Sequence, residues 1–233
     1  MTPAVTDVNT IVAGCGSSRA LPVAVRISFC LLSSVVRCMN ILKFNPAPEV
    51  TKMNMVDIIK KRRSIRDYES REIPDESLKA ILEAVGNSQS WANSQCWEII
   101  VLTDPGVKKA VQEAVPPGNP SFNAIVKAPV VLAVCAKLEL SGYYGGVPPT
   151  KFGDWFMFDL GIITENICLT AHDLGLGTVV VGLFDQARAG AILSVPAGYE
   201  LVSLIPVGYP IPNAPVRNAP RRDVKEFTHY NGF

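Results

Sequence analysis

Apolar residues recur at helical spacing in several parts of the chain after residue 54. The clearest predicted helix carries the i, i+3, i+4, i+7 pattern and is bounded by Pro74 before it and Gly86 after it. Its apolar face consists of Leu78, Ile81, Leu82 and Val85. A longer helix is predicted over residues 154–174, where Gly175 and Gly177 would end it.

Three shorter helices are predicted from their caps and spacing. One covers residues 55–63, one follows Asp104-Pro105, and one follows Asp185, because Asp is a favoured N-cap and Pro is tolerated in a first turn. The inner face of the second of these helices is predicted to be Val107, Ala110, Val111 and Ala114.

Short apolar runs bounded by turn residues predict strands over residues 97–102, 130–136, 178–182 and 199–207. The first of these runs is predicted to be a buried strand. Because helices and strands intermix along the chain, the pattern indicates an α+β protein built around one sheet.

Residues 138–153 are rich in Gly, Pro and Tyr and show no periodicity. A loop of this length inside a domain is often a functional lid, although ordinary packing against the core is an equal alternative. The aromatic residues that would form such a lid are Tyr143, Tyr144, Trp155 and Phe156.

The first part of the chain has a different character. Its apolar run from Leu21 to Val36 is interrupted by Arg26, whereas a membrane span needs about 20 uninterrupted apolar residues. A signal peptide and a poorly ordered extension are both open, and the broken run favours the extension. We therefore predict an N-terminal extension over residues 1–52, a domain over residues 53–233, no membrane span and a cytoplasmic location.

Composition limits the partners. A formal net charge of +1 argues against nucleic acid, which usually requires a broad basic face, so any bound anion is expected to be small. The cysteines form no CxxC pair and the chain has only two histidines, so we expect no metal site. Cys96, Cys135 and Cys168 are predicted to be reduced and buried.

Charge is nevertheless concentrated at one place, since five cations fall within residues 60–66. A solvated helix end is the simple explanation, because cations are favoured near a helix C-terminus. Ser64 and Arg66 continue the pattern beyond the predicted helix, and guanidinium and hydroxyl groups together suit a single phosphate. Near the other end of the chain, Arg221-Arg222 forms a second cationic pair.

Two further segments could join this site. Residues 88–97 carry amide and hydroxyl side chains just before a predicted strand; a polar turn is the common explanation, but amides can also read the polar edge of a heteroaromatic ring. The glycines at 175, 177 and 182 flank another predicted strand, where a backbone without a side chain can approach a flat ligand.

Four blocks in order resemble the flavin-dependent nitroreductase family over residues 55–233. They are RRSIRDY, ANSQCWEIIV, DLGIITENICLTAHDLGLGTVVVGLFD and RRDVKEFTHY. The resemblance implies a central mixed or antiparallel sheet flanked by helices in a single domain, and a homodimer with FMN at its interface. It also implies NAD(P)H as electron donor, with hydride transfer through flavin N5 to nitroaromatics, quinones or similar small flat acceptors.

The resemblance also implies roles for particular residues. Arg62, Arg63, Ser64 and Arg66 would hold the phosphate and ribityl chain, with Arg221 and Arg222 reaching the phosphate from the tail. Asn93 and Gln95 would contact polar atoms of the ribityl chain or ring. Gly182 and Leu183 would present backbone amides to the ring. No residue is assigned as a catalytic acid, because the flavin carries the chemistry.

Some residues depart from the family pattern, and other functions stay open. Gln89 and Cys96 replace prolines, and Trp91 replaces an alanine, so Trp91 could stack on the flavin, restrict access or fill the core. One alternative is a flavin-binding sensing or storage module without turnover. Another is a relative with dehalogenase or flavin-cleaving chemistry, although the segment at 138–153 shows no clear equivalent of the lid of such relatives.

Overall fold

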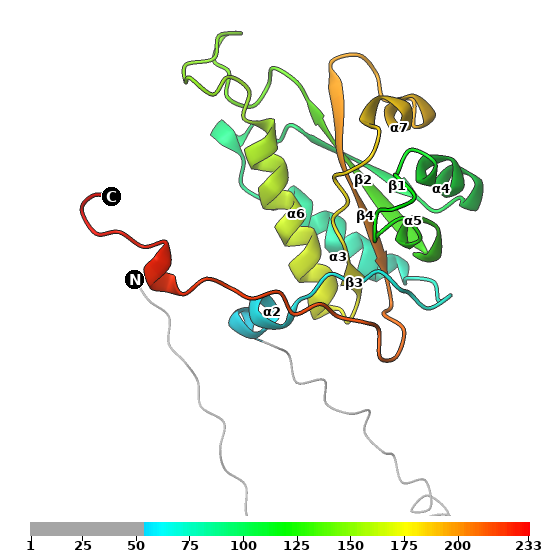
Figure 1. Ribbon diagram of the computed structural model, residues 1–233. Helices are drawn as coiled ribbons and strands as arrows, with labels where there is room; N and C mark the ends of the chain where they lie inside the picture. The colour runs from blue at the N-terminus through cyan, green and yellow to red at the C-terminus, as the bar shows by residue number, and fades with distance from the viewer. Residues whose placement is uncertain (1–53) are drawn as a thin grey trace, which may run out of the picture. The chain divides into compact units, whose positions relative to one another are not determined.

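A four-stranded antiparallel sheet forms the centre of the computed structural model, which describes residues 54–233 (Figure 1). The predicted N-terminal extension over residues 1–52 lies outside the described residues. The strands are β1 (Trp97–Leu102), β2 (Val130–Lys137), β3 (Gly177–Thr178) and β4 (Tyr199–Gly208), in the spatial order β1-β2-β4-β3. Helices cover the sheet, so the predicted α+β class and antiparallel sheet are confirmed.

The central strand β2 shows why the sheet is covered on both faces. All of its residues except Lys137 are buried. Val131, Ala133 and Cys135 belong to one core cluster, whereas Leu132 and Val134 belong to the other. Alternate side chains of a strand point to opposite faces, so β2 separates two hydrophobic cores.

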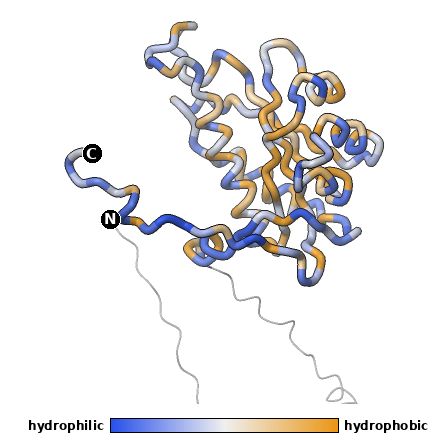
Figure 2. Tube along the Cα trace, viewed as in Figure 1, coloured by the Kyte–Doolittle hydropathy of each residue, from blue (hydrophilic) through white to orange (hydrophobic). Residues whose placement is uncertain are grey.

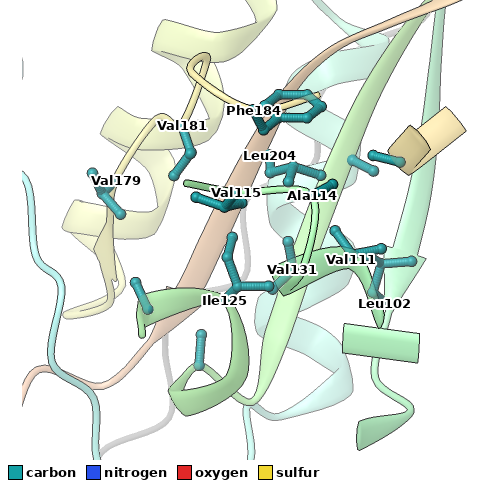
Figure 3. Close-up of a cluster of buried hydrophobic side chains, with 14 of the residues drawn as sticks. Leu102, Val111, Ala114, Val115, Ile125, Val131, Val179, Val181, Phe184 and Leu204 are labelled. Atoms are coloured by element: carbon teal, nitrogen blue, oxygen red, sulfur yellow. The ribbon is translucent and has the colours of Figure 1, made fainter. Parts of the chain in front are cut away.

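Each core is closed by its own set of helices. On one face lie α3 (Asp75–Gly86) and α6 (Phe156–Asp173), which pack against each other. On the other face lie α4 (Pro105–Gln112), α5 (Ala124–Lys127) and α7 (Gln186–Ile192), over the cluster drawn in Figure 3. Figure 2 shows apolar residues gathered in this central region and polar residues along much of the C-terminal tail. The short helix α2 (Met55–Lys61) lies near the end of α6.

Several predicted boundaries need correction. The first helix ends at Lys61 and not at residue 63, because Arg62 adopts extended backbone angles (φ −53°, ψ 132°). The strand β1 is present as predicted but is only partly buried, since it is the edge strand and only Leu102 is fully covered. The long helix α6 begins at Phe156, two residues later than expected.

The predicted strand over 178–182 is interrupted, and a proline explains the break. Thr178 pairs with Val207 of β4, and Val181 pairs with Leu204 in the same register. Two residues separate these pairs, and in this register Pro206 lies opposite the first of them, Val179. Proline has no N–H to donate, so the ladder cannot close there and β3 ends at Thr178.

The inner face of α4 also differs from the prediction. Val107 is 36% exposed, whereas Lys108 is only 6% exposed. The Lys108 ammonium donates to the carbonyl oxygens of Ala128 (2.8 Å) and Pro129 (3.1 Å), just before β2. A buried cation is tolerated because these carbonyls replace water, and burial lowers the pKa of Lys108.

Close packing at Gly177 brings the start of the domain against β3. Ser64 forms a parallel bridge with Thr178, and the Ile65 N–H donates to the Thr178 carbonyl at 2.9 Å. A Cβ placed on Gly177 would lie 2.7 Å from Ile65 Cβ. Only glycine allows the two backbones to come this close.

We expect Gly177→Ala to lower the free energy of unfolding by about 1–3 kcal/mol, because the added methyl overlaps Ile65. Urea denaturation measures the change. Gly161→Ala in α6 is the matched control: its Cβ meets no atom within 4 Å, so helix propensity should leave stability equal or raised by up to about 1 kcal/mol. A Gly177→Ala protein as stable as wild type would contradict the packing argument.

Candidate functional site

The cationic residues gather beside the C-terminal end of α6. Arg62, Arg63, Ser64 and Arg66 follow α2, and the bridge between Ser64 and Thr178 fixes them beside β3. All four side chains are partly buried. The fold places the start of this segment near α2, α6 and β3, and the role predicted for its side chains stays a prediction.

Neutral groups hold the guanidinium groups in place. Arg63 donates through Nη1 to the carbonyl oxygens of Lys60 (2.6 Å) and Arg62 (2.8 Å), and through Nε to Asn218 Oδ1 (3.0 Å). Arg66 donates through Nε to Ser121 Oγ at 3.2 Å. Among residues 54–233, no carboxylate forms an ion pair with Arg62, Arg63 or Arg66. Partly buried cations without a counterion make a site that favours an anion.

A half-buried histidine lies beside the cationic cluster. His172 lies in the last turn of α6, and its Nε2 is buried without a hydrogen-bond partner in the described part of the chain. Burial lowers the pKa of His172, and the charge of Arg62 lowers it further. The neutral imidazole therefore adds no charge to the cluster.

The C-terminal tail passes the cationic cluster, and its two arginines have different partners. Asn218 binds Arg63, and Figure 1 shows the tail running past α2. Arg221 is exposed and donates only to the nearby Ala219 carbonyl, at 3.3 Å. Arg222 instead pairs with Glu226 at 3.4 Å and lies over the Phe227 ring. Within this chain, Arg221 is thus the freer of the two tail cations.

Gly182 and Leu183 lie in a second part of the site. A groove of about 520 Å³ runs between the first half of α6 and β4, and Gly182 lines it together with Val180, Met157 and Gly161. A Cβ on Gly182 would meet no atom within 4 Å, and Leu183 is 69% exposed. The backbone at 182–183 is therefore open to a ligand.

Asn93 and Gln95 are held by a strained turn. Ala92, Asn93 and Gln95 all have positive φ angles, of 43°, 56° and 48°. Gln95 Nε2 donates to Asn93 Oδ1 at 3.2 Å, and both residues are exposed. Such backbone angles cost free energy and persist only where surrounding contacts impose them, as at binding sites.

A buried carboxylate imposes this conformation. Asp159 is fully buried in the first turn of α6. Its oxygens accept hydrogen bonds from the Trp91 N–H (3.0 Å), Ser94 Oγ (3.3 Å) and Ser141 Oγ (2.7 Å). Three segments far apart in sequence therefore meet at one side chain. Our sequence analysis missed this residue, although an acidic residue within the apolar stretch FMFDLGII was a usable signal.

Cys96 also contacts Asp159, with its Sγ 3.7 Å from Oδ2. Burial raises the pKa of the Cys96 thiol to about 12, and the carboxylate adds to this shift. The thiol is therefore protonated at neutral pH and is a poor nucleophile. Cys96, Cys135 and Cys168 are all free and buried, which confirms the prediction for these three residues.

Trp91 packs among aromatic side chains from the 138–155 loop and α6. The centroid of its ring lies 4.9 Å from the ring centroid of Trp155 and 6.1 Å from that of Tyr144. Trp155 Nε1 donates to Thr150 Oγ1 at 2.9 Å, and Phe152 and Phe158 pack against Trp155. Of the roles predicted for Trp91, packing has the direct support: the indole joins the polar turn to the loop predicted to be a lid.

The two ends of the predicted site lie on opposite faces of α6. Asp159 holds the 91–94 turn, and Asn166 Nδ2 donates to Ser88 Oγ at 2.6 Å, so this face carries the polar segment. The groove is lined by Met157, Gly161 and Thr164. At about 100° per residue these two sets point in nearly opposite directions around the helix. One chain therefore does not bring Asn93 and Gln95 to Gly182 and Leu183.

Residues 54–233 contain neither a metal-ligand cluster nor a membrane-spanning helix. No three His, Cys, Asp or Glu side chains in this region are grouped as metal ligands would be. None of the helices in the same region has the length and apolar character needed to cross a membrane.

Comparison with known proteins identifies the family. The sequence profile of the Nitroreductase family matches residues 59–209. An NADH dehydrogenase from Thermus thermophilus is 31% identical over 177 residues, covering 64% of this chain and 83% of that protein. An iodotyrosine deiodinase from Nematostella vectensis is 27% identical over 188 residues, covering 72% and 71%.

A solved structure agrees with this result. The FMN-dependent nitroreductase from Clostridium difficile R20291 superposes with a TM-score of 0.63 at 27% identity, covering 76% of this chain and 99% of that one. The chain therefore belongs to the nitroreductase family of oxidoreductases, which confirms the resemblance inferred from the four sequence blocks.

We expect Asp159→Ala to destabilise the protein by roughly 3 kcal/mol, because the buried donors of Trp91 and Ser141 lose their acceptor. The midpoint of urea denaturation measures this loss. Asp173→Ala is the control on the same helix; its carboxylate is exposed, so the change should stay within about 0.5 kcal/mol. Equal midpoints for the two variants would show that Asp159 does not organise the turn.

Proposed function

We propose that this protein is an NAD(P)H-dependent FMN oxidoreductase that reduces nitroaromatics, quinones or similar flat acceptors. The observation that carries the proposal is the set of three partly buried guanidinium groups without a carboxylate partner in the described chain, together with an open backbone at 182–183. Membership of the nitroreductase family supports it. So does the similarity to an FMN-dependent nitroreductase structure.

The residues present fit the chemistry of FMN. Arg63 has already used Nε and Nη1, and Arg66 has used Nε, so their remaining N–H groups are free to donate to phosphate oxygens. Gly182 leaves room for a flat ring, and the amides of Asn93 and Gln95 carry both donors and acceptors. Arg221 would complete the phosphate end.

Bound FMN would supply the two-electron redox chemistry between NAD(P)H and the acceptor, and the protein would bind and orient the participants. The cationic cluster would neutralise the phosphate. Apolar groove residues such as Met157 and Val180 would exclude water from the flat faces of the ligands. No side chain near the groove is needed as a proton donor in this assignment.

We further propose that each FMN lies between two subunits of a homodimer. Asn93 and Gln95 lie across α6 from Gly182 and Leu183, so these residues can share a flavin only if they come from different chains. The exposed apolar side chains of Met157, Phe158, Val180 and Leu183 give such a dimer an interface to bury. On this arrangement the cluster and the groove of one chain are completed by the polar turn of its partner.

The purified protein should be yellow, and excess NADH or NADPH should bleach it under anaerobic conditions. Absorption spectroscopy followed by steady-state turnover with a nitroaromatic, a quinone and a halogenated tyrosine tests this. The last acceptor is included because an iodotyrosine deiodinase is among the relatives. If FMN bound to the protein stays oxidised in the presence of both nucleotides, the proposed enzymatic function is refuted and a sensing or storage module is favoured.

The flavin content of one double variant tests whether the cationic cluster binds the phosphate. Arg63→Ala combined with Arg66→Ala should release FMN, since each charged hydrogen bond contributes about 1.5–3 kcal/mol. Lys79→Ala removes an exposed cation from α3 and should leave flavin content unchanged. Full flavin occupancy in the double variant would show that the phosphate lies elsewhere.

Mixed dimers distinguish a shared site from a site within one chain. A subunit with Arg63→Ala and Arg66→Ala is paired, through different affinity tags, with a subunit carrying Asn93→Ala and Gln95→Ala. If the site is shared, one of the two sites in the mixed dimer is intact, so FMN should approach one per dimer. If each site lies within one chain, both sites are damaged, and the FMN content of the mixed dimer should lie between those of the two parent dimers.

A further inference from the structure

We propose that Asn119 and Gln186 are positioning residues that fix the peptide groups at 182–183 for a flavin ring. This inference rests on the proposed function, because it assigns a task to two residues beside the ring end of the proposed FMN site. Neither side chain was among the predicted site residues. Both act through the backbone and not by reaching the reacting atoms.

The two side-chain amides each hold one carbonyl of the loop. Gln186 Nε2 donates to the Gly182 carbonyl at 3.2 Å, and Asn119 Nδ2 donates to the Leu183 carbonyl at 3.2 Å. The described chain contains no cis peptide, so the N–H of each peptide points opposite to its carbonyl. The N–H groups of Leu183 and Phe184 are thereby turned away from these amides.

Among residues 54–233, the N–H groups at the two ends of this loop are paired, whereas the three between them, of Gly182, Leu183 and Phe184, have no acceptor. The Val181 N–H donates to the Leu204 carbonyl, and the Asp185 N–H donates to the Ala114 carbonyl. Between them, the N–H groups of Leu183 and Phe184 have no acceptor among residues 54–233. The loop is anchored at both ends and offers donors in its middle, which is the arrangement that an acceptor on a ligand requires.

Asn119 also connects this loop to the cationic cluster. Its Oδ1 accepts from the Ser121 N–H at 2.8 Å, and Ser121 Oγ accepts from Arg66 Nε at 3.2 Å. Ser121 is buried. A continuous chain of hydrogen bonds therefore runs from Arg66 through Ser121 and Asn119 to Leu183.

This connecting turn is itself rigid. The Asn119 N–H donates to the Pro116 carbonyl and the Phe122 N–H donates to the Asn119 carbonyl, both at 2.9 Å. Gln112 Nε2 holds the Phe122 carbonyl at 3.0 Å. On the α7 side, Arg188 pairs with Glu113 at 2.8 Å. The distance between Arg66 and the 182–183 loop is therefore set by protein contacts before any ligand binds.

Two isosteric variants remove the donors while keeping the shapes. Asn119→Asp keeps the oxygen that accepts from Ser121 and loses the N–H that donates to the Leu183 carbonyl. Gln186→Glu loses the N–H that donates to the Gly182 carbonyl. Gln186→Leu is the uncharged counterpart. Riboflavin, which lacks the phosphate, and FMN are the two probes, titrated into apoprotein and followed by flavin fluorescence.

We expect each donor-removing variant to weaken riboflavin and FMN binding alike, by about tenfold, because the loop loses a hydrogen bond that orients it. The visible absorption band of the bound flavin should also shift, since the donors around the ring change. Arg66→Ala should differ: FMN binding falls while riboflavin binding stays within about twofold. Urea denaturation of the apoproteins verifies that the variants are folded.

The outcomes separate this inference from the proposed function. Wild-type protein that binds neither riboflavin nor FMN would overturn the proposed function and this inference with it. Wild-type protein that binds both, with Asn119→Asp and Gln186→Leu matching its affinity and spectrum, would overturn this inference alone. Loss of FMN binding with riboflavin binding retained in Asn119→Asp would also overturn it, because it would place Asn119 at the phosphate end.

Discussion

The buried carboxylate of Asp159 is the contact on which the arrangement of this molecule depends. It lies in the first turn of α6, where a negative charge is also favoured by the helix dipole, and donors from two other segments replace the water that it loses. Without it, the strained turn at 92–95 would have no reason to keep its positive φ angles. Asp159, together with the hydrogen bond from Asn166 to Ser88, therefore determines where the polar segment lies relative to α6.

The helix α6 then separates the parts of the candidate site. Its C-terminal end faces the cationic cluster, one side of its first half lines the groove, and the opposite side carries the polar turn. The glycine at 177 lets the cationic segment approach β3, and Pro206 ends β3 so that the chain can open at Gly182. These local constraints explain why the polar turn and the groove lie on opposite sides of α6 within one chain.

Sequence alone was sufficient where structure is decided by near neighbours. The caps at Asp104 and Asp185 and the apolar spacing of 78–85 gave the helices correctly, and the cations at 62–66 could be found because they are adjacent in the chain. The features that the sequence did not predict depend on contacts with residues far away in the chain. Nothing near Asp159 reveals its donors, nothing near residue 179 reveals Pro206, and no local pattern tells Lys108 from a surface lysine. The residues that link Arg66 to the 182–183 loop, Ser121 and Asn119, were missed for the same reason.

The cationic cluster has a consequence for the life of the protein in the cell. Guanidinium groups held close together repel one another, and their repulsion is relieved only when an anion arrives. On the proposed function, a newly made chain without bound FMN is thus a less stable molecule than the loaded one, and the difference grows with ligand concentration. Quality-control proteases degrade the less stable form preferentially. On the proposed assignment of the site to FMN, the steady-state abundance of this protein would follow the supply of FMN, so that folded molecules accumulate only to the extent that they can be loaded.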